Sequence, residues 1–267
     1  MERELPGFDP HTPSVARLYD YYLGGKDHFP ADREAAERIL KVAPEVRAAA
    51  RANRAFLGRA VRYLGEVGIR QFLDIGTGLP TQGNVHEIAR KAAPGSRVVY
   101  VDRDPVVLVH ARALLDGQGD AAVVAGDLRD PAGIVKDPHV LEMIDFSRPV
   151  GVLLVAIMHF ISESERPMEI IATLRDAMAP GSYLVLSHGT SDARAAAVDK
   201  GTEVYKNASA QLTLRGRDRI LALFEGFDLV DPGLVWLPEW QPDQADTVDF
   251  VEGPESSLIL CGVGRKG

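Results

Sequence analysis

The chain has 267 residues, of which 46% are hydrophobic and 25% are charged. This composition is typical of a globular protein and argues against a collagen-like fibre, a long disordered tail or a disulfide scaffold. Thirty Lys and Arg residues against 38 Asp and Glu give a net charge of -8, which disfavours nucleic acid as a partner.

The single cysteine, Cys261, excludes an intrachain disulfide and a multi-cysteine metal site, and we expect no metal. The first residues lack a basic stretch followed by an apolar one, and no run reaches the roughly 18 apolar residues that a membrane span requires. We therefore expect a cytoplasmic protein without a membrane partner. The sequence does not predict an oligomeric state.

Residues 1–66 are predicted to form a helical cap that precedes the sheet. Its first helix is expected to begin at Thr12, a residue type that caps helix N-termini, and to end at Gly24. A second helix should follow Pro30. A third, over residues 44–65, carries most of an apolar stripe at helical spacing.

Residues 67–267 alternate short apolar runs with amphipathic stretches, the pattern of a sheet with crossover helices. Right-handed crossovers would stack the strands into a doubly wound, parallel sheet, and a capping box from Ser162 to Glu165 should open the last crossover helix. Strands are expected at 71–75, 97–101, 122–125, 150–158 and 182–187, with helices at 82–92, 104–116, 138–145 and 163–178.

The C-terminal part departs from this alternation. After a helix at about 214–224, two strands are expected at 227–237 and 257–264 without a crossover helix between them, so they must pair antiparallel. A mostly parallel sheet that ends in an antiparallel pair is the plan of class I methyltransferases. We expect an α/β fold of this Rossmann-like kind. The stretch 193–211 could add another helix, which the pattern does not settle.

Two glycines, Gly76 and Gly78, stand where the first strand turns into a helix. Such a turn lets the backbone approach a ligand and points free N–H groups toward it. An ordinary tight turn would explain a lone Gly-x-Gly about as well, so the neighbouring residues have to decide.

Three carboxylates, Asp74, Asp102 and Asp127, stand at the ends of three successive strands and should converge on one crevice. Asp102 could accept the hydroxyls of an adenosyl ribose, and Asp127 an adenine amino group, although Asp127 could instead cap a helix. A dinucleotide would want glycine where Thr81 stands. Asp74 would repel a pyrophosphate but suits an aminoacyl sulfonium.

The string from Asp74 to His86, followed by residues 97–108, resembles a family of S-adenosylmethionine-dependent methyltransferases widespread in actinobacteria and long catalogued as a domain of unknown function. The resemblance extends to residues 17–27, 51–57 and 224–234, and therefore to almost the whole chain. It implies a class I Rossmann-like fold that binds S-adenosylmethionine, and it names no acceptor. The residues expected to bind the cofactor are Asp74, Gly76, Thr77, Gly78, Asp102, Arg103, Gly126, Asp127, Leu128 and Ala156.

The sequence gives fewer signals for the residues that would bind the methyl acceptor. Methyl transfer from a sulfonium needs mainly alignment of the reactants, which can contribute roughly 7 to 11 kcal/mol to lowering the barrier. After the fourth strand, the sequence lacks the Asp/Asn-Pro-Pro-aromatic tetrapeptide of many methyltransferases that act on nucleobases or glutamine, which favours a small-molecule acceptor. His159 could act there as a general base, or could pack under the following helix.

The N-terminal helices could supply a lid or acceptor-side groups, namely Tyr22, Lys26 and Arg54. Tyrosine faces attract a sulfonium, and Arg54 could hold a carboxylate. A buried aromatic stripe and a solvated row of arginines are the alternatives. Two other functions stay open: an NAD(P)-dependent oxidoreductase on a Rossmann fold, and a non-catalytic protein that binds S-adenosylmethionine.

Overall fold

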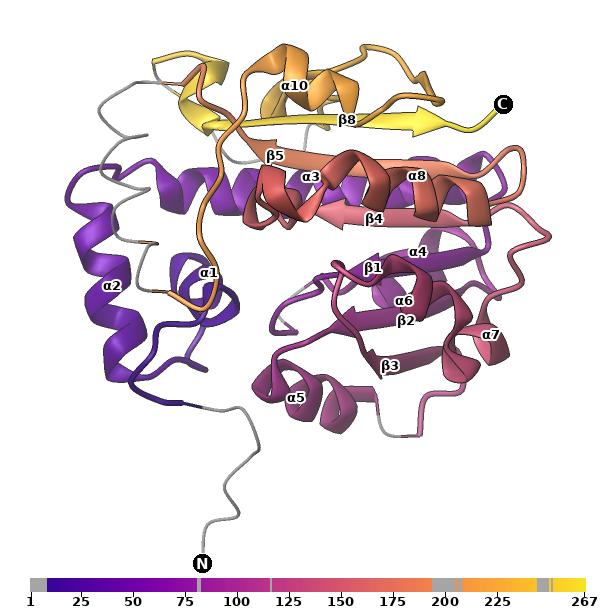
Figure 1. The fold of residues 1–267 in the computed structure, drawn as a ribbon, viewed down its shortest axis with the longest axis horizontal. Coiled ribbons are helices and arrows are strands. Elements are labelled where there is room, and N and C mark those ends of the chain that lie inside the picture. The colour runs from indigo at the N-terminus through magenta and orange to yellow at the C-terminus, as the bar shows by residue number, and fades with distance from the viewer. Residues whose placement is uncertain are drawn as a thin grey trace, which may run out of the picture.

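The computed structural model describes residues 9–80, 83–115, 117–193, 205, 208–243, 250 and 252–267. Within them lies one mixed sheet with the strand order β3-β2-β1-β4-β5-β8-β6, and β7 pairs with β8 beside that path. Helices cover both faces of the sheet, with α3 and α4 behind it and α6, α7 and α8 in front (Figure 1). This is the class I methyltransferase-like arrangement that the alternation of strands and helices predicts.

Five strands form the parallel part of the sheet. Every residue of β1 and of β5 is buried, as expected for strands covered on both faces. Their register brings the carboxyl ends of β1, β2 and β3 together, with Ile75 opposite Val101 and Asp102 opposite Ala125. The strands are β1 (Gln71–Ile75), β2 (Arg97–Asp102), β3 (Ala121–Ala125), β4 (Gly151–Val155) and β5 (Tyr183–Gly189).

The C-terminal strands pair antiparallel, as the missing crossover helix predicts. β8 (Ile259–Arg265) runs antiparallel to β5 and is paired on its other side by β6 (Asp228–Leu229) and β7 (Val235–Trp236). The single strand predicted at 227–237 is wrong, because a turn divides it. Pro232 in that turn has no N–H to give to the ladder, and Gly233 has a φ of +90°.

The crossover helices are shorter than the pattern predicts. They are α4 (Val85–Ala92), α5 (Pro105–Leu115), α6 (Pro131–Lys136), α7 (Pro138–Met143), α8 (Pro167–Ala177) and α10 (Arg217–Ala222), with 3-10 turns η1 (Met158–Phe160), η2 (Glu163–Glu165), η3 (Leu237–Glu239) and η4 (Pro254–Ser257). The separate helix α6 was not predicted. The positions of Thr81 and Gln82, and most of the stretch 193–211, lie outside the described residues.

Two boundaries near the fourth strand are corrected. The strand predicted over 150–158 ends at Val155, because Ala156 has a φ of +57° and leaves the extended conformation. The capping box from Ser162 to Glu165 is present, but it opens the short turn η2. Arg166, with a φ of +56°, separates that turn from α8.

The N-terminal helices are α1 (Val15–Leu23), α2 (Pro30–Leu40) and α3 (Val46–Glu66). The N-cap of α1 is Ser14 rather than Thr12, whose hydroxyl instead donates to Asp9. Gly24 ends α1 in the left-handed conformation, as predicted. The C-terminal half of α3 packs on the sheet, where Phe56 and Phe72 share one buried cluster, so the boundary proposed at residue 66 stays a prediction.

Two polar contacts hold the N-terminal helices in place, one between α1 and α2 and one between α1 and the loop after β2. The Arg17 guanidinium donates to Asp32 at 2.7 Å, and the same carboxylate accepts from the backbone N–H groups of Ser14 and Phe29. The Ser14 hydroxyl donates to Asp104 at 2.7 Å, which ties the start of α1 to the loop after β2. Helices α1 and α2 therefore stand beside the carboxyl ends of the strands, whereas α3 runs from there along the back of the sheet (Figure 1).

In the part of the chain that the structure describes, no helix is long and apolar enough to cross a membrane. Among the same residues, no three His, Cys, Asp or Glu side chains are grouped in a way that could hold a metal ion.

Candidate functional site

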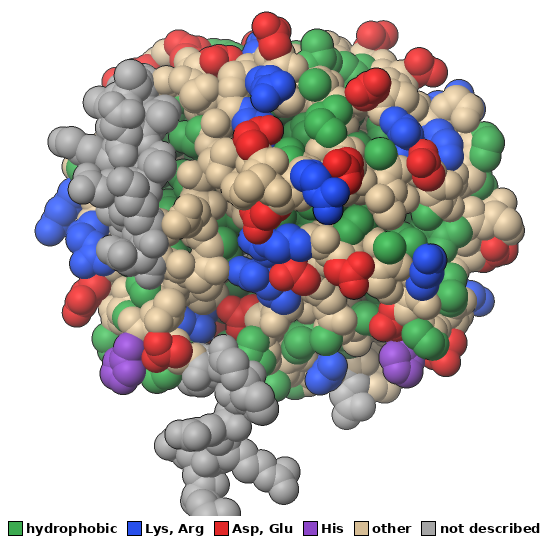
Figure 2. Space-filling model, in the orientation of Figure 1, with side chains coloured by type: hydrophobic (Ala, Val, Ile, Leu, Met, Phe, Trp, Pro, Cys, Tyr) green, Lys and Arg blue, Asp and Glu red, His purple; other side chains and the backbone are tan. Residues whose placement is uncertain are grey.

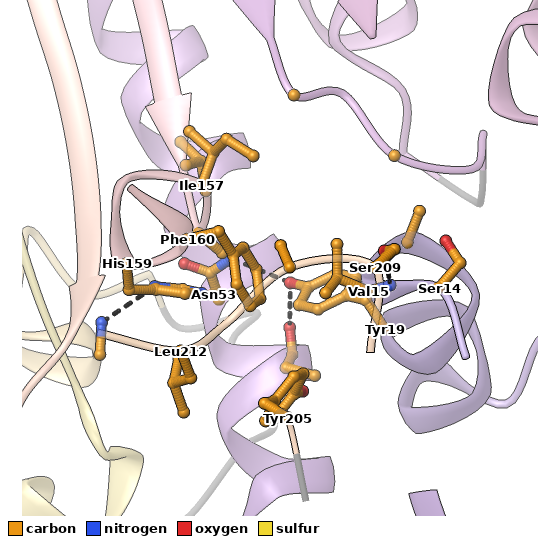
Figure 3. Close-up of a pocket in the computed structure, with 18 of the residues that line it drawn as sticks. Ser14, Val15, Tyr19, Asn53, Ile157, His159, Phe160, Tyr205, Ser209 and Leu212 are labelled. Carbon is orange, nitrogen blue, oxygen red and sulfur yellow. Dashed lines mark hydrogen bonds between the residues drawn. The ribbon is translucent and has the colours of Figure 1, made fainter. Parts of the chain in front are cut away.

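A cavity of about 570 Å³ lies at the carboxyl ends of β1 to β5, under the N-terminal helices. Figure 3 shows part of its wall, with Tyr19 from α1, Asn53 from α3 and His159 and Phe160 from η1. The structure brings nearly all of the predicted site residues to this wall: Asp74, Gly76, Thr77, Gly78, Asp102, Arg103, Gly126, Asp127, Leu128, Ala156, His159, Tyr22 and Arg54. Lys26 is exposed between α1 and α2 and does not line the cavity.

The glycine turn after β1 has the backbone that its residue types predict. Gly76 and Gly78 have φ values of +74° and +67°, which L side chains rarely adopt. A Cβ added to Gly76 would lie 2.5 Å from Cγ1 of Ile157, whereas one added to Gly78 would meet nothing within 4 Å. Gly76 therefore permits close packing against the loop after β4, and Gly78 leaves open space beside the cavity.

Asp102 is held at the end of β2 by backbone donors. Its Oδ2 accepts from the N–H of Gly78 at 2.9 Å, and its Oδ1 accepts from the N–H of Asp104 at 2.9 Å. Burial raises the pKa of Asp102, and these N–H groups act in the opposite direction. The carboxylate is thereby fixed on the wall of the cavity, and each oxygen keeps a lone pair for a further donor.

Asp74 is the other buried carboxylate of the site. Burial raises its pKa to about 6, against the lowering effects of Arg54 and of the Thr77 hydroxyl, which donates to it at 3.1 Å. The nearby Asp102 raises this pKa further. A second positive charge placed beside Asp74 would therefore be favourable, because it would stabilise the ionised carboxylate.

Asp127 joins two arginines at the end of β3. Its oxygens lie 3.3 Å from Arg103 and 3.1 Å from Arg129, and these groups, with the backbone N–H of Arg129, lower its pKa although burial acts against them. Asp130, not Asp127, is the N-cap of α6, so helix capping does not explain Asp127. The second guanidinium nitrogen of Arg103 donates to the backbone oxygen of Ser209.

Arg54 reaches from α3 to the loop between β1 and α4. Its guanidinium donates to the backbone oxygen of Gly83 at 3.0 Å and lowers the pKa of Asp74. Arg47, earlier on the same helix, pairs instead with Glu37 and stacks over Tyr21, outside the cavity wall. Of these two arginines, only Arg54 therefore lines the cavity.

His159 is buried on the turn after β4. Its Nδ1 accepts from the backbone N–H of Gly189 at 3.2 Å. Burial holds its pKa well below the usual value, and His188 and Arg215 lower it further. His188 is itself fixed between the backbone oxygen of Gly189 and the Arg215 guanidinium, at 2.7 and 2.8 Å.

Sequence reasoning missed the residues that connect the cap with the sheet at this site. The Ser187 hydroxyl donates to Asn53 Oδ1 at 2.6 Å, and Asn53 Nδ2 donates to the Tyr19 hydroxyl at 2.9 Å. The sequence signal that could have identified them is the presence of small polar residues within a mainly apolar strand and within the apolar stripe of a helix. Ser209 bonds the backbone of Pro13 and Val15 and so brings the segment 208–215, here called the strap, across the cavity.

The comparisons with known proteins agree with the geometry of the site. A family model described as S-adenosyl methyltransferase matches residues 2–267. A crystal structure of a candidate methyltransferase from Thermobifida fusca YX is similar with 42% identity and a TM-score of 0.90, covering 98% of this chain and 97% of that one. No match was found among curated proteins.

A DUF574 family protein from Streptomyces avermitilis MA-4680 is 40% identical with a TM-score of 0.92, over 97% of this chain and 99% of that one. An O-methyltransferase family protein from Burkholderia thailandensis, 16% identical with a TM-score of 0.51 over 80% of this chain and 58% of that one, shares the fold alone. The sequence left open whether the chain is a methyltransferase or an oxidoreductase. The family match identifies a methyltransferase, and the cofactor of this family is S-adenosylmethionine. The chain belongs to the S-adenosyl methyltransferase family.

Proposed function

We propose that this methyltransferase transfers the methyl group of S-adenosylmethionine in line to a small-molecule acceptor held in the cavity under the cap. The observation that carries the proposal is the continuity of this cavity. Its wall runs from the carboxylates at the ends of β1, β2 and β3 to apolar residues of α1, α2 and α3. Donor and acceptor could therefore lie next to each other in one cavity.

The residues at the strand ends fit the cofactor in chemistry and in space. Gly78 offers open space beside the wall, and Asp102 offers two fixed carboxylate oxygens to a pair of ribose hydroxyls. Asp127 suits an exocyclic amino group, which needs an acceptor. Asp74 and Arg54 together suit an aminoacyl group, because one can pair with an ammonium and the other with a carboxylate.

When bound, S-adenosylmethionine supplies a methyl group on a positively charged sulfur that is already activated for displacement. The work left to the chain is to align the acceptor with that methyl group and to exclude water. The cap and the strap are suited to both tasks. Ser14, Ser209 and Arg103 link α1, the strap and the loop after β2 into one cover.

The surface also favours a small acceptor over a nucleic acid. The net charge is -8, and on the face in Figure 2 the Lys and Arg side chains are interspersed with Asp and Glu instead of forming one continuous basic surface. A phosphate backbone is bound mainly by such a surface. A cavity of about 570 Å³ likewise suits a molecule small enough to be held within it.

The test follows a labelled methyl group. The protein is incubated with methyl-labelled S-adenosylmethionine and an extract of Streptomyces avermitilis that has been separated by ultrafiltration into low-mass and macromolecular fractions. We expect label to enter the low-mass fraction, and to do so much less with Asp102→Asn. Label confined to protein or nucleic acid, or no transfer in either fraction, would contradict the proposal.

A further inference from the structure

Six uncharged side chains line the part of the cavity beneath the cap, here called the cap chamber: Tyr19, Tyr22, Ile39, Ala43, Val46 and Ala49. Two charged residues, Arg17 of α1 and Arg54 of α3, also line the cavity; Arg17 is paired with Asp32, and Arg54 donates to the backbone oxygen of Gly83. Tyr205 packs against the same cluster, and its ring lies 5.7 Å from that of Phe160 at the chamber's inner end. A charged molecule in this chamber would lose its hydration, and the six side chains that define the chamber offer it no opposite charge.

The hydroxyl groups of the chamber are neutral at every ordinary pH. The Tyr19 hydroxyl accepts from Asn53 and donates to the backbone oxygen of Ala50 at 3.1 Å, so its orientation is fixed. The Tyr22 hydroxyl is buried and makes no hydrogen bond of normal geometry among the described residues. Burial, and secondarily Tyr205 beside it, raise the pKa of Tyr22. Tyr22 can therefore serve a bound molecule as a neutral hydrogen-bond partner.

His159 stands where η1 meets this chamber, with its ring 4.4 Å from that of Phe160 (Figure 3). The backbone N–H of Gly189 can only donate, so the Nδ1 that accepts from it carries no proton. The ring is neutral, with the charged Arg215 and the neutral His188 packed beside it. Its one proton is consequently on Nε2, which makes Nε2 a hydrogen-bond donor.

We propose that the cap chamber takes an uncharged, mainly apolar acceptor, and that His159 donates a hydrogen bond from Nε2 to an oxygen of that acceptor. This replaces the role of general base that the sequence suggested for His159, because a nitrogen that already carries a proton cannot remove one. The inference rests on the proposed function, since it concerns the acceptor side of the same cavity.

The tautomer can be measured without knowing the acceptor. Protein labelled with ¹⁵N-histidine and saturated with S-adenosylhomocysteine is studied by long-range ¹H–¹⁵N correlation, and the His159 signals are assigned from their loss in His159→Phe. We expect the pattern of a neutral ring protonated at Nε2, unchanged from mildly acidic to mildly alkaline pH. Protonation at Nδ1 instead, or a ring that titrates within that range, would overturn the donor role.

The chamber is tested with matched probes, 1-naphthol and 1-naphthoate, added to the protein saturated with S-adenosylhomocysteine. We expect saturable binding of 1-naphthol and at least tenfold weaker binding of the anion. Ala49→Phe, which fills the chamber, should abolish 1-naphthol binding, and Ala49→Leu should weaken it. Ala113→Phe, on the exposed face of α5, should leave it unchanged. Equal binding of the two probes, or no binding of 1-naphthol, would overturn the inference.

Two further measurements test the hydrogen bond from His159 separately from the binding of the cofactor. His159→Phe should weaken 1-naphthol binding about two- to tenfold, the range for one hydrogen bond, without affecting naphthalene, and His159→Gln should restore it by supplying an N–H donor. Equal effects on 1-naphthol and naphthalene would contradict the donor role. Failure of S-adenosylhomocysteine itself to bind would instead count against the proposed function as a whole.

Discussion

The Ser187 hydroxyl, on the buried strand β5, donates a 2.6 Å hydrogen bond to the side-chain oxygen of Asn53 on α3. Ser187 also accepts from the backbone N–H of Ala156, at the positive-φ residue that follows β4. Asn53 in turn orients the Tyr19 hydroxyl in the cap chamber. One chain of hydrogen bonds thus links the end of the sheet with the wall that would face the acceptor.

Removing the centre of this chain should destabilise the protein. Asn53→Ala leaves the buried hydroxyl of Ser187 without its acceptor, and we expect the free energy of unfolding to fall by about 1 to 3 kcal/mol. Chemical denaturation of Asn53→Ala, Ser187→Ala and the double variant measures the coupling, expected at roughly 0.5 to 3 kcal/mol. Additive effects of the two substitutions would contradict the link.

Removal of the buried carboxylate that joins α1 and α2 should lower the free energy of unfolding by more than removal of Asn53. Asp32 is fully buried and accepts from Arg17 and from two backbone N–H groups, so Asp32→Ala leaves a buried guanidinium uncompensated. We expect a loss of roughly 3 to 5 kcal/mol in the free energy of unfolding. Glu34→Ala, on the exposed side of α2, is the matched control and should change it by less than about 0.5 kcal/mol. Equal effects would be inconsistent with this role.

The glycine turn allows strain to be separated from ligand binding. Gly78→Ala and Gly95→Ala both place a Cβ at positive φ with nothing within 4 Å, and each should lower the free energy of unfolding by about 1 to 2 kcal/mol. Because Gly78 lines the cavity and Gly95 does not, only the substitution of Gly78 should weaken binding of S-adenosylhomocysteine. Thermal denaturation and calorimetric titration check the two effects, and similar affinities for both variants would place the turn outside the site.

Asp74 should make cofactor binding depend on pH. Its pKa is raised to about 6, and a cation bound beside it would favour the ionised form. The affinity for S-adenosylmethionine should therefore fall as the pH drops through about 6, by up to about tenfold per unit. Calorimetry of wild type and Asp74→Asn tests this; the variant should bind weakly with a flat profile near pH 6. A wild-type profile that is flat there would argue against contact with Asp74.

The same pKa shift has a consequence for stability. The folded pKa of Asp74 exceeds its usual value of 3.8, so between these pH values the folded protein binds more protons than the unfolded one. Asp74 therefore stabilises the ligand-free protein at low pH, where it is protonated, and this contribution is lost as the pH rises through about 6. Asp74→Asn should therefore stabilise the ligand-free protein at neutral pH, by at most about 3 kcal/mol. Denaturation at two pH values measures this difference.

Most of the parallel sheet follows from local sequence. Strands such as β1 and β5 are short, wholly buried and mainly apolar runs, so their positions depend little on the rest of the chain. Carboxyl ends of parallel strands meet at one edge, which is why Asp74, Asp102 and Asp127 could be placed together from sequence.

The other features of the fold and the site depend on contacts between residues far apart in the sequence, which no local pattern contains. The end of β4 is set by the positive φ of Ala156, where Ser187 receives its N–H, and the start of α1 by Ser14 bonding to Asp32 and Asp104. The tautomer of His159 depends on a backbone N–H of Gly189, thirty residues later in the chain.

The placement of the cofactor at the end of β2 is tested most directly by titrating S-adenosylhomocysteine into two variants by isothermal calorimetry. Asp102→Asn should lose about 1.5 to 3 kcal/mol of binding free energy, roughly 10- to 150-fold in affinity, because its hydrogen bonds to the ligand lose a charged acceptor. Asp120→Asn, which removes a charge paired with Arg90 just before β3, should bind like wild type. Unchanged affinity in Asp102→Asn would contradict the site described for this methyltransferase.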